Sequence, residues 1–213
     1  KNTINPEEII KDYGADAVRL FILSDSPPEK DVQWSNSGIK ASYKFVQKFW
    51  IMHLGIKEQI EKKIKIDKNK EDIYKFTNQI IEKITRNLEN FQYNVLVANL
   101  HEIYNYYSKN NALIDSEDLK INYIKIIGIL NPILPHLSSE CFHDLNIKND
   151  NLWPKIEKKY LKENKTTIVV QINGKKRSTI KVDLNTQDEK VMAEVSKDEK
   201  SGKYLNNKNI LKK

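Results

Sequence analysis

The sequence predicts a mainly α-helical protein, an antiparallel helical bundle followed by a small α+β domain. Up to about residue 147, apolar residues recur three and four positions apart in successive segments with short connections, which is typical of amphipathic helices in a bundle. After Trp153-Pro154 the spacing changes to two, and an Asn-Gly pair separates two runs of β-branched residues. With 213 residues, 39% of them hydrophobic, the chain has enough apolar material for two domains with lean cores.

Two short helices are expected at the start of the chain. Asn5 can cap the first helix, Pro6 suits its first turn, and Gly14 ends it. A second helix covers about residues 16–23. The Ser-Pro-Pro run at residues 26–28 must end this helix, because proline has no amide hydrogen to donate.

Five helices are expected in the bundle. Ser35 is a suitable cap for the first, which is long and amphipathic, and a Lys-rich linker follows at about residues 57–70. Three more helices and a fifth over about residues 136–145 complete the bundle. The predicted inward positions of the first four helices, in order, are Ile39, Tyr43, Val46, Phe49, Trp50 and Leu54; Ile73, Phe76, Ile80, Ile84 and Leu88; Val95, Ala98, Leu100, Ile103 and Tyr107; and Leu119, Tyr123, Ile126, Ile127 and Leu130.

The last third of the chain predicts a β-hairpin followed by a helix. Residues 166–172 and 175–182 are the two strands, and Asn173-Gly174 between them is a strong hairpin signal. Thr186 and Glu189 are spaced as a capping box for the helix. The inward residues of this helix are expected to be Val191 and Val195.

These elements divide the chain into four successive parts. They are an N-terminal segment, a helical bundle, a linker and a small α+β domain, expected at residues 1–34, 35–154, 155–165 and 166–213. Residues 209–213 have the pattern of an unfinished strand. We therefore expect the chain to be a piece of a longer polypeptide, in which a further strand would stabilise the small domain.

The positive charge is concentrated at one end of the chain. Residues 1–147 hold 19 Lys and Arg against 20 Asp and Glu, whereas residues 148–213 hold 17 against 9, so the net charges are −1 and +8. A localised basic surface attracts polyanions. From composition alone, a proteome that uses Lys as its default surface residue explains the excess equally well.

The sequence contains no recognisable catalytic or metal-binding constellation. The four histidines lack companions at the spacing of a metal site, and Cys141, the only cysteine, lies in an apolar helix, where we expect a buried, inert thiol. There is no glycine-rich phosphate loop, no apolar run long enough to span a bilayer and no signal peptide. We therefore predict a soluble intracellular protein, in a reducing cytoplasm, that binds no cofactor or metal.

A candidate binding surface lies on the predicted hairpin. Lys175, Lys176 and Arg177 follow the Asn-Gly turn and Lys181 lies further along the same strand, where backbone and side chains can meet phosphate oxygens. Alternation along a strand places Lys175 and Arg177 on one face and Lys176 on the other. Lysines that protect a strand edge from aggregation are an equally good explanation of the pattern itself.

Several segments carry motifs that extend over most of the chain. They are residues 1–10 (KNTINPEEII), 13–21 (YGADAVRLF), 26–39 (SPPEKDVQWSNSGI), 91–98 (FQYNVLVA) and 130–136 (LNPILPH). Together they resemble the region after the KMSKS signature of class I aminoacyl-tRNA synthetases, including the anticodon-binding bundle shared by the leucyl, isoleucyl, valyl and methionyl enzymes. Trp153-Pro154 and residues 168–180 (IVVQINGKKRSTI) resemble the small terminal domain of bacterial leucyl-tRNA synthetases, which the valyl and isoleucyl enzymes do not usually carry.

The resemblance implies a parent enzyme that activates leucine with ATP and Mg²⁺ and transfers it to tRNA(Leu). The catalytic and editing motifs of such an enzyme are not in this sequence, so we expect the chain to position tRNA(Leu) beside an upstream catalytic domain, as a monomer without catalytic activity. The resemblance favours Lys175, Lys176, Arg177 and Lys181 as tRNA-binding residues. It also indicates Lys48, at a helix position where the family often has a basic residue.

Three alternatives remain open at this point. The chain could be the corresponding region of a valyl- or isoleucyl-tRNA synthetase, although the hairpin motif argues against this. It could be a helical protein-interaction module whose basic tail binds an acidic partner. Finally, the isolated chain could bind nothing measurable, because affinity for tRNA is shared among the domains of the whole enzyme.

Overall fold

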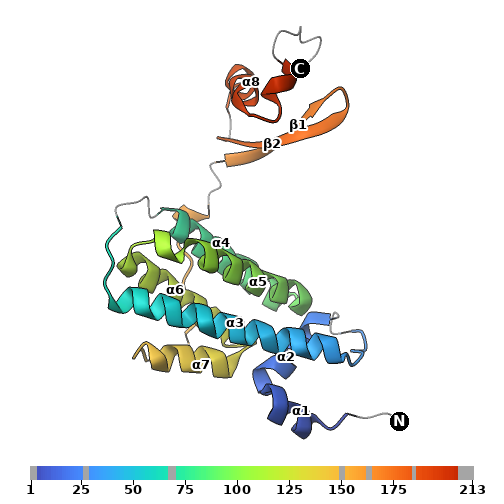
Figure 1. The fold of residues 1–213 in the computed structure, drawn as a ribbon, viewed down its shortest axis with the longest axis vertical. Coiled ribbons are helices and arrows are strands. Elements are labelled where there is room, and N and C mark those ends of the chain that lie inside the picture. Colours follow the sequence, from blue (N-terminus) through green and yellow to red (C-terminus); the bar gives the residue numbers. More distant parts are fainter. Residues whose placement is uncertain are drawn as a thin grey trace. The chain divides into compact units, whose positions relative to one another are not determined.

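A computed structural model of the chain shows a helical bundle and a small hairpin-containing unit (Figure 1). Residues 1–161 and 162–213 form two compact units, each described by itself below. The predicted fold class, mainly helical with a small two-stranded antiparallel hairpin near the C-terminus, is confirmed. The structure describes residues 4–25, 29–66, 71–148, 152–161, 165–183 and 186–205.

Both predicted N-terminal helices are present. Helix α1 (Pro6–Tyr13) begins after Asn5, whose side chain accepts a hydrogen bond from the Glu7 amide at 3.1 Å. It ends at Gly14, whose φ of +80° is readily reached only without a side chain. Helix α2 (Ala15–Asp25) follows at once, and the Ser-Pro-Pro run predicted to end it lies outside the described residues.

The N-terminal helices pack against the start of α3 (Asn36–Glu61). Ser35 caps α3 as predicted, with its hydroxyl accepting from the Gly38 amide at 3.1 Å. Gly38 also makes room for Phe21 of α2, because a Cβ at Gly38 would lie 2.6 Å from the Phe21 ring. Phe21 is buried there and meets Trp34 edge-on, with ring centroids 5.2 Å apart. The apolar face of α2 is therefore docked on the bundle, except for Ile22, which is exposed.

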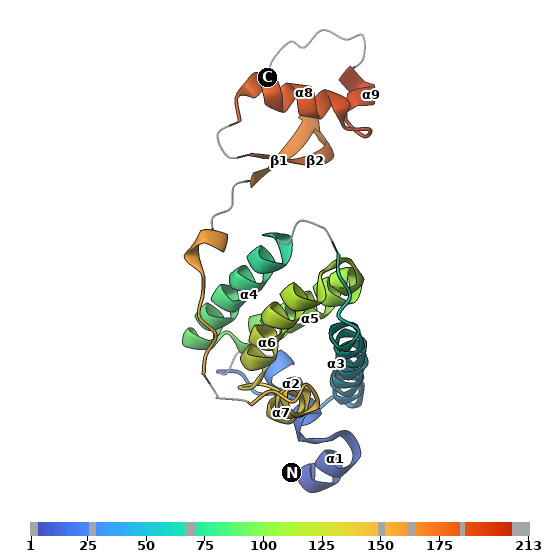
Figure 2. The same ribbon diagram turned by 90° about the vertical axis from the view of Figure 1, so that its left-hand side faces the viewer.

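Four more helices complete the bundle: α4 (Glu71–Glu89), α5 (Tyr93–Asn110), α6 (Ser116–Leu130) and α7 (Pro135–Asp144). Helix α4 packs against α5 and α6, while α3 packs against α2, α5, α6 and α7 (Figures 1 and 2). One 3₁₀ turn, Asn111–Leu113, lies between α5 and α6, and another, Lys158–Tyr160, follows α7 in the sequence. The fully buried core side chains include Phe49, Ile56, Ile81, Ile84, Leu96, Leu100, Ile103, Tyr107, Leu119, Tyr123, Ile126, Ile127 and Leu130.

Helix α3 extends further than predicted, and its inward face differs slightly. The Lys-rich linker expected from residue 57 begins only after Glu61, because Ile56 is fully buried and the Gln59 side-chain amide donates to the Asn111 and Ile114 carbonyls at 2.9 and 2.7 Å. Leu54, predicted to face inward, is 43% exposed.

The predicted inward face of α5 is also wrong at the start of the helix. Val95 is 44% exposed and Ala98 is exposed, whereas Leu96 and Val97 are buried. The three later inward positions, Leu100, Ile103 and Tyr107, were predicted correctly and are fully buried. Leu96 lies one turn before Leu100, so the phase of the helix is set by its buried C-terminal half, which the N-terminal half must follow.

The second unit is a β-hairpin with two helices. Strands β1 (Lys165–Ile172) and β2 (Lys175–Asp183) pair antiparallel through Asn173-Gly174, as predicted, and the φ angles of +53° and +73° fit a type I′ turn. Helices α8 (Asp188–Lys197) and α9 (Gly202–Leu205) lie on one side of this hairpin (Figure 2). The small core contains Val170, Ile180, Val182 and Val195, with Ile168, Ile172, Val191 and Leu205 packed against it.

The capping box predicted for α8 is wrong. The N-cap residue is Gln187, which makes no side-chain capping bond. The Thr186 hydroxyl donates instead to the Asp183 carbonyl at 2.6 Å, closing the turn that leaves β2. The spacing of Thr186 and Glu189 gave no sign of this hydrogen bond from Thr186 to Asp183, which takes the place of the cap. The inward positions of Val191 and Val195 are confirmed.

Candidate nucleic-acid interface

A β-bulge shapes the basic segment of the hairpin. Val170 pairs with Ser178 and Gln171 pairs with Lys176, so the register passes over Arg177. A bulge of this kind puts two residues of one strand opposite one residue of the other and changes the direction of the side chains locally. The sequence pattern predicted an uninterrupted strand and gave no signal for this irregularity.

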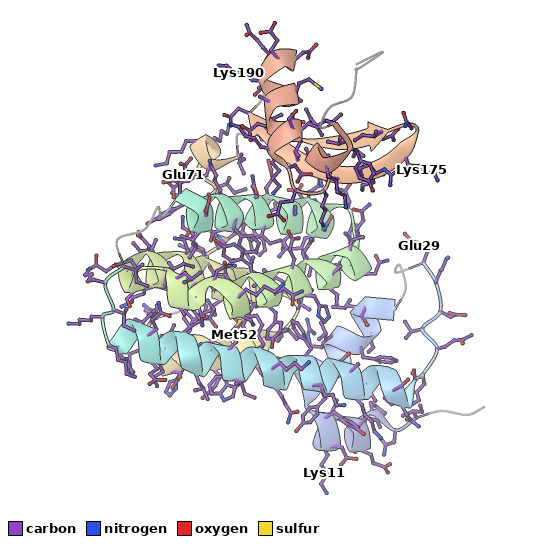
Figure 3. All side chains as sticks on the ribbon, turned by 45° about the horizontal axis from the view of Figure 1, so that its top comes forward. Lys11, Glu29, Met52, Glu71, Lys175 and Lys190 are labelled. Atoms are coloured by element: carbon purple, nitrogen blue, oxygen red, sulfur yellow. The ribbon has the colours of Figure 1, made fainter. Side chains whose placement is uncertain are left out.

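The bulge divides the four candidate cations between the two faces of the hairpin. Cross-strand partners share a face. Lys175 pairs with Ile172, which packs against the small core, so Lys175 lies on the helix-bearing side at the turn end, where Figure 3 labels it. Lys176 and Lys181 pair with Gln171 and Thr167 on the opposite face. The basic segment therefore presents charge on both sides of the turn.

The three lysines of β2 are free to bind an anion. Lys175, Lys176 and Lys181 are exposed, and within the described residues none of them forms an ion pair. In the bundle, by contrast, Lys57 lies 2.7 Å from Asp144 and Lys83 lies 2.9 Å from Glu102. Cations without a nearby carboxylate leave their full charge for a ligand.

Arg177 is held by the protein itself. Its Nη1 donates to the Tyr204 hydroxyl at 3.2 Å, and its guanidinium carbon lies 4.3 Å from the centre of the Tyr204 ring. Its Nε is buried and has no hydrogen-bond partner among the described atoms. The side chain is half-buried, so Arg177 differs from its three lysine neighbours in being both packed and oriented.

Lys48 lies in the other unit, on the exposed face of α3. Two further exposed lysines, Lys40 and Lys44, precede it at intervals of four residues and therefore lie along the same helix face. Within the described residues none of the three forms an ion pair. Lys48 is close to His101 of α5, where burial and then the Lys48 charge lower the pKa of the imidazole. The sequence shows this spacing too, but the family resemblance indicates only Lys48.

Comparison with known proteins identifies the family. Residues 70–193, from α4 into α8, match the family described as the anticodon-binding domain of tRNA ligase. The chain belongs to this family. The anticodon-binding match therefore includes four bundle helices, the hairpin and its bulge.

Individual relatives extend the match to the remaining residues. Leucine–tRNA ligases of Petrotoga mobilis and Orientia tsutsugamushi are both 36% identical to this chain, over 99% and 100% of its length. The chain spans 27% and 25% of these two relatives. The predicted resemblance to bacterial leucyl-tRNA synthetases is therefore confirmed.

A solved structure supports the fold. It is the ternary complex of the AgnB2 leucyl-tRNA synthetase of Agrobacterium radiobacter K84 with tRNA and LeuAMS. The similarity covers 99% of this chain and 28% of that chain, with a TM-score of 0.76 at 21% identity.

Two charged residues of α2 fasten the N-terminal segment onto the anticodon-binding bundle. The buried Asp16 carboxylate accepts from the Leu137 amide at 2.7 Å and from the preceding amide at 3.3 Å, which caps the N-terminus of α7. Arg19 donates to the Pro132 carbonyl at 2.6 Å and to the next carbonyl at 3.0 Å. The partners are more than 110 residues away in sequence, so no local pattern could have revealed them.

A buried polar network joins three helices of the bundle. His53 of α3 is fully buried, with Nδ1 3.1 Å from the Tyr123 hydroxyl and Nε2 3.1 Å from Asp144, which also pairs with Lys57. Because a carboxylate can only accept, Nε2 donates to Asp144 and Nδ1 accepts from Tyr123. Burial lowers the pKa of His53, and the Lys57 hydrogen bond followed by that of His53 lowers the pKa of Asp144.

This network does not form a reaction site. His53 is enclosed by protein. Cys141 is also buried, and burial raises its pKa to about 12, so it carries no thiolate at neutral pH. In the described part of the chain, no three His, Cys, Asp or Glu side chains gather as a metal site would require. The helices of that part are also too short or too polar to cross a membrane.

Proposed function

We propose that the chain is the tRNA-binding part of a leucine–tRNA ligase, the enzyme that joins leucine to tRNA(Leu) at the expense of ATP. The observation that carries this proposal is the similarity to leucine–tRNA ligases over 99–100% of the chain, which includes the bundle and the hairpin together. The hairpin motif favoured this family over the valyl and isoleucyl enzymes, and the relatives agree.

In this proposal five cations bind tRNA through its phosphate backbone. Lys175, Lys176, Arg177 and Lys181 surround the turn of the hairpin, and Lys48 lies on an exposed lysine row in the bundle. Structured RNA is recognised mainly by its shape and its phosphates, because its deep groove is too narrow for side chains to read. Charges on both faces of the turn suit a bent backbone better than a flat acidic protein surface.

The catalytic steps belong to other parts of the parent enzyme. ATP and Mg²⁺ would be bound by an upstream catalytic domain of the same polypeptide, and this chain alone would neither activate leucine nor edit mischarged tRNA. Its contribution is to hold tRNA(Leu) so that the acceptor end reaches that domain. The protein would act as a monomer in the cytoplasm.

Binding to three labelled tRNA transcripts tests the proposal. Fluorescence anisotropy of tRNA(Leu), tRNA(Val) and tRNA(Ile) is recorded with the purified chain at two salt concentrations. We expect tRNA(Leu) to bind more tightly and to keep this preference at the higher salt concentration. Equal binding that salt abolishes would reduce the surface to a general polyanion site. Preference for another tRNA would contradict the leucine assignment.

A further inference from the structure

A second cation, Lys203 of α9, lies near the Tyr204 ring that contacts Arg177. Lys203 Nζ lies 5.3 Å from the centre of the Tyr204 ring, and Arg177 lies 4.3 Å from the centre of the same ring. One tyrosine therefore gathers two cations that are 26 residues apart in sequence. The sequence pattern around the Asn-Gly turn indicated only Arg177.

The two cations are not neutralised within the described part of the unit. Lys203 is exposed, and neither it nor Arg177 forms an ion pair there. Asp198 is a carboxylate of the same region, but it accepts from the Ser201 amide at 2.9 Å and from the Ser201 hydroxyl at 2.7 Å. Like charges held near one ring repel each other, and a bound anion would offset this repulsion.

The packing around α9 fixes Tyr204 in place. The Ser178 hydroxyl of β2 donates to the Ser201 hydroxyl at 3.2 Å, and Ser201 is fully buried just before α9. At Gly202 a Cβ would clash with the carbonyl oxygen of Ser196, so the chain turns into α9 against the end of α8. These contacts therefore fix the position of Tyr204 beside Arg177 in the bulge.

We propose that Arg177, Lys203 and Tyr204 form one phosphate-binding site for the tRNA backbone, in which Tyr204 is a positioning residue. The inference rests on the proposed function and adds α9 to the binding surface. The Tyr204 hydroxyl accepts a hydrogen bond from Nη1 of Arg177, and the Tyr204 ring restricts the orientation of the guanidinium plane. Because Nε is buried, Nη2 is the nitrogen left to bind an oxygen of the phosphate. Holding the side chain before binding reduces the rotamer entropy that binding would otherwise cost.

Substitutions at Tyr204 test this arrangement in the full 213-residue chain. Tyr204→Leu removes both the ring and the hydroxyl, and we expect the affinity for tRNA(Leu) to fall about threefold to tenfold, the loss of roughly one oriented charged contact. The salt slope should fall by up to about 0.9, the value for one phosphate contact on a duplex. Tyr204→Phe keeps the ring and should lose less. Lys203→Ala should resemble Tyr204→Leu.

A double-mutant cycle separates positioning from folding. If Tyr204 acts through Arg177, then Tyr204→Leu should have little further effect on affinity in an Arg177→Ala background. Tyr204→Leu should leave the hydrogen-exchange rates of the hairpin amides unchanged, both in the otherwise unchanged chain and in the Arg177→Ala background. Tyr204→Leu with increased exchange would mean only a structural role, and this result would overturn the positioning claim.

Two further outcomes distinguish failure of this inference from failure of the proposed function. If the unchanged chain binds tRNA(Leu) and the Tyr204→Leu and Lys203→Ala variants bind equally well, only the inference is wrong. If replacing Lys175, Lys176, Arg177 and Lys181 together also leaves binding unchanged, the hairpin is not a tRNA site and the functional proposal for it fails as well. Lys190→Ala, an exposed α8 lysine labelled in Figure 3, is the single-charge control.

Discussion

His53 makes the stability of the bundle depend on pH. Its imidazole is fully buried and neutral, donating to Asp144 and accepting from Tyr123, and burial lowers its pKa below the ordinary 6.5. In the unfolded chain the same imidazole takes up a proton near pH 6.5. The stability that it contributes is therefore complete above about pH 6.5 and is lost as the pH falls through the lowered pKa of the folded protein.

This linkage predicts an acid-sensitive free energy of unfolding. Between pH 7.5 and 5.5, urea denaturation should show a falling free energy of unfolding for the unchanged chain. The fall should be smaller for His53→Gln, which cannot be protonated. His143→Gln, at an exposed histidine of α7, is the matched control and should keep the original pH dependence. Equal pH dependence for His53→Gln and the unchanged chain would remove His53 from the explanation.

Cys141 should be unreactive while the bundle is folded. The thiol is fully buried and burial raises its pKa to about 12, so almost no thiolate forms and reagents cannot reach it. We expect a colorimetric disulfide reagent to label Cys141 no faster than global unfolding allows, and at once in urea. Rapid labelling of the folded chain would show that α7 opens locally.

Helix α3 carries both extremes of burial on isoleucines of the same helix. Ile56 is fully buried, whereas Ile51 is 68% exposed. Ile56→Ala should lower the free energy of unfolding by about 2–5 kcal/mol, because it leaves a cavity in the core. Ile51→Ala should change it by less than about 0.5 kcal/mol. Similar effects of the two substitutions in urea denaturation would contradict the placement of α3.

The contact of Asp16 in α2 with the start of α7 should contribute to the stability of the fold. Asp16→Ala removes the carboxylate that accepts two amides at the start of α7, and should cost about 0.5–2 kcal/mol of stability. Asp12→Ala, on the exposed side of α1, is the control and should be nearly neutral. If both variants unfold at the same urea concentration, the N-terminal segment is not fastened through Asp16.

Local signals predicted the elements better than they predicted the contacts. Asn5, Ser35 and the Asn-Gly turn act within a few residues of themselves, and all three behave as the sequence indicated. The start of α5 was placed wrongly because partners in other helices decide which side is buried. The bulge at Arg177 and its contact with Tyr204 depend on how β2 meets α9, which no short-range pattern encodes.

At the scale of the whole molecule, the net charge differs between the two ends of the chain. Residues 1–147 are almost neutral, with many of their lysines in ion pairs, whereas the last third carries the positive excess. The sequence alone could not decide between a tRNA site and protection of a strand edge. The structure adds unpaired lysines on both faces of the turn and an arginine oriented by Tyr204. An edge needs neither of these features to resist aggregation.

The salt dependence of tRNA(Leu) binding tests the central claim most directly. The slope of log affinity against log salt is measured for the unchanged chain and for a variant with Lys175, Lys176, Arg177 and Lys181 replaced by Ala. A control variant loses the same charge at four exposed lysines elsewhere, Lys11, Lys109, Lys120 and Lys190. We predict that the hairpin variant loses a few units of slope, at up to roughly 0.9 per phosphate contact, and the control far less. Equal slopes for the hairpin variant and the unchanged chain would contradict the account and leave these residues as edge protection.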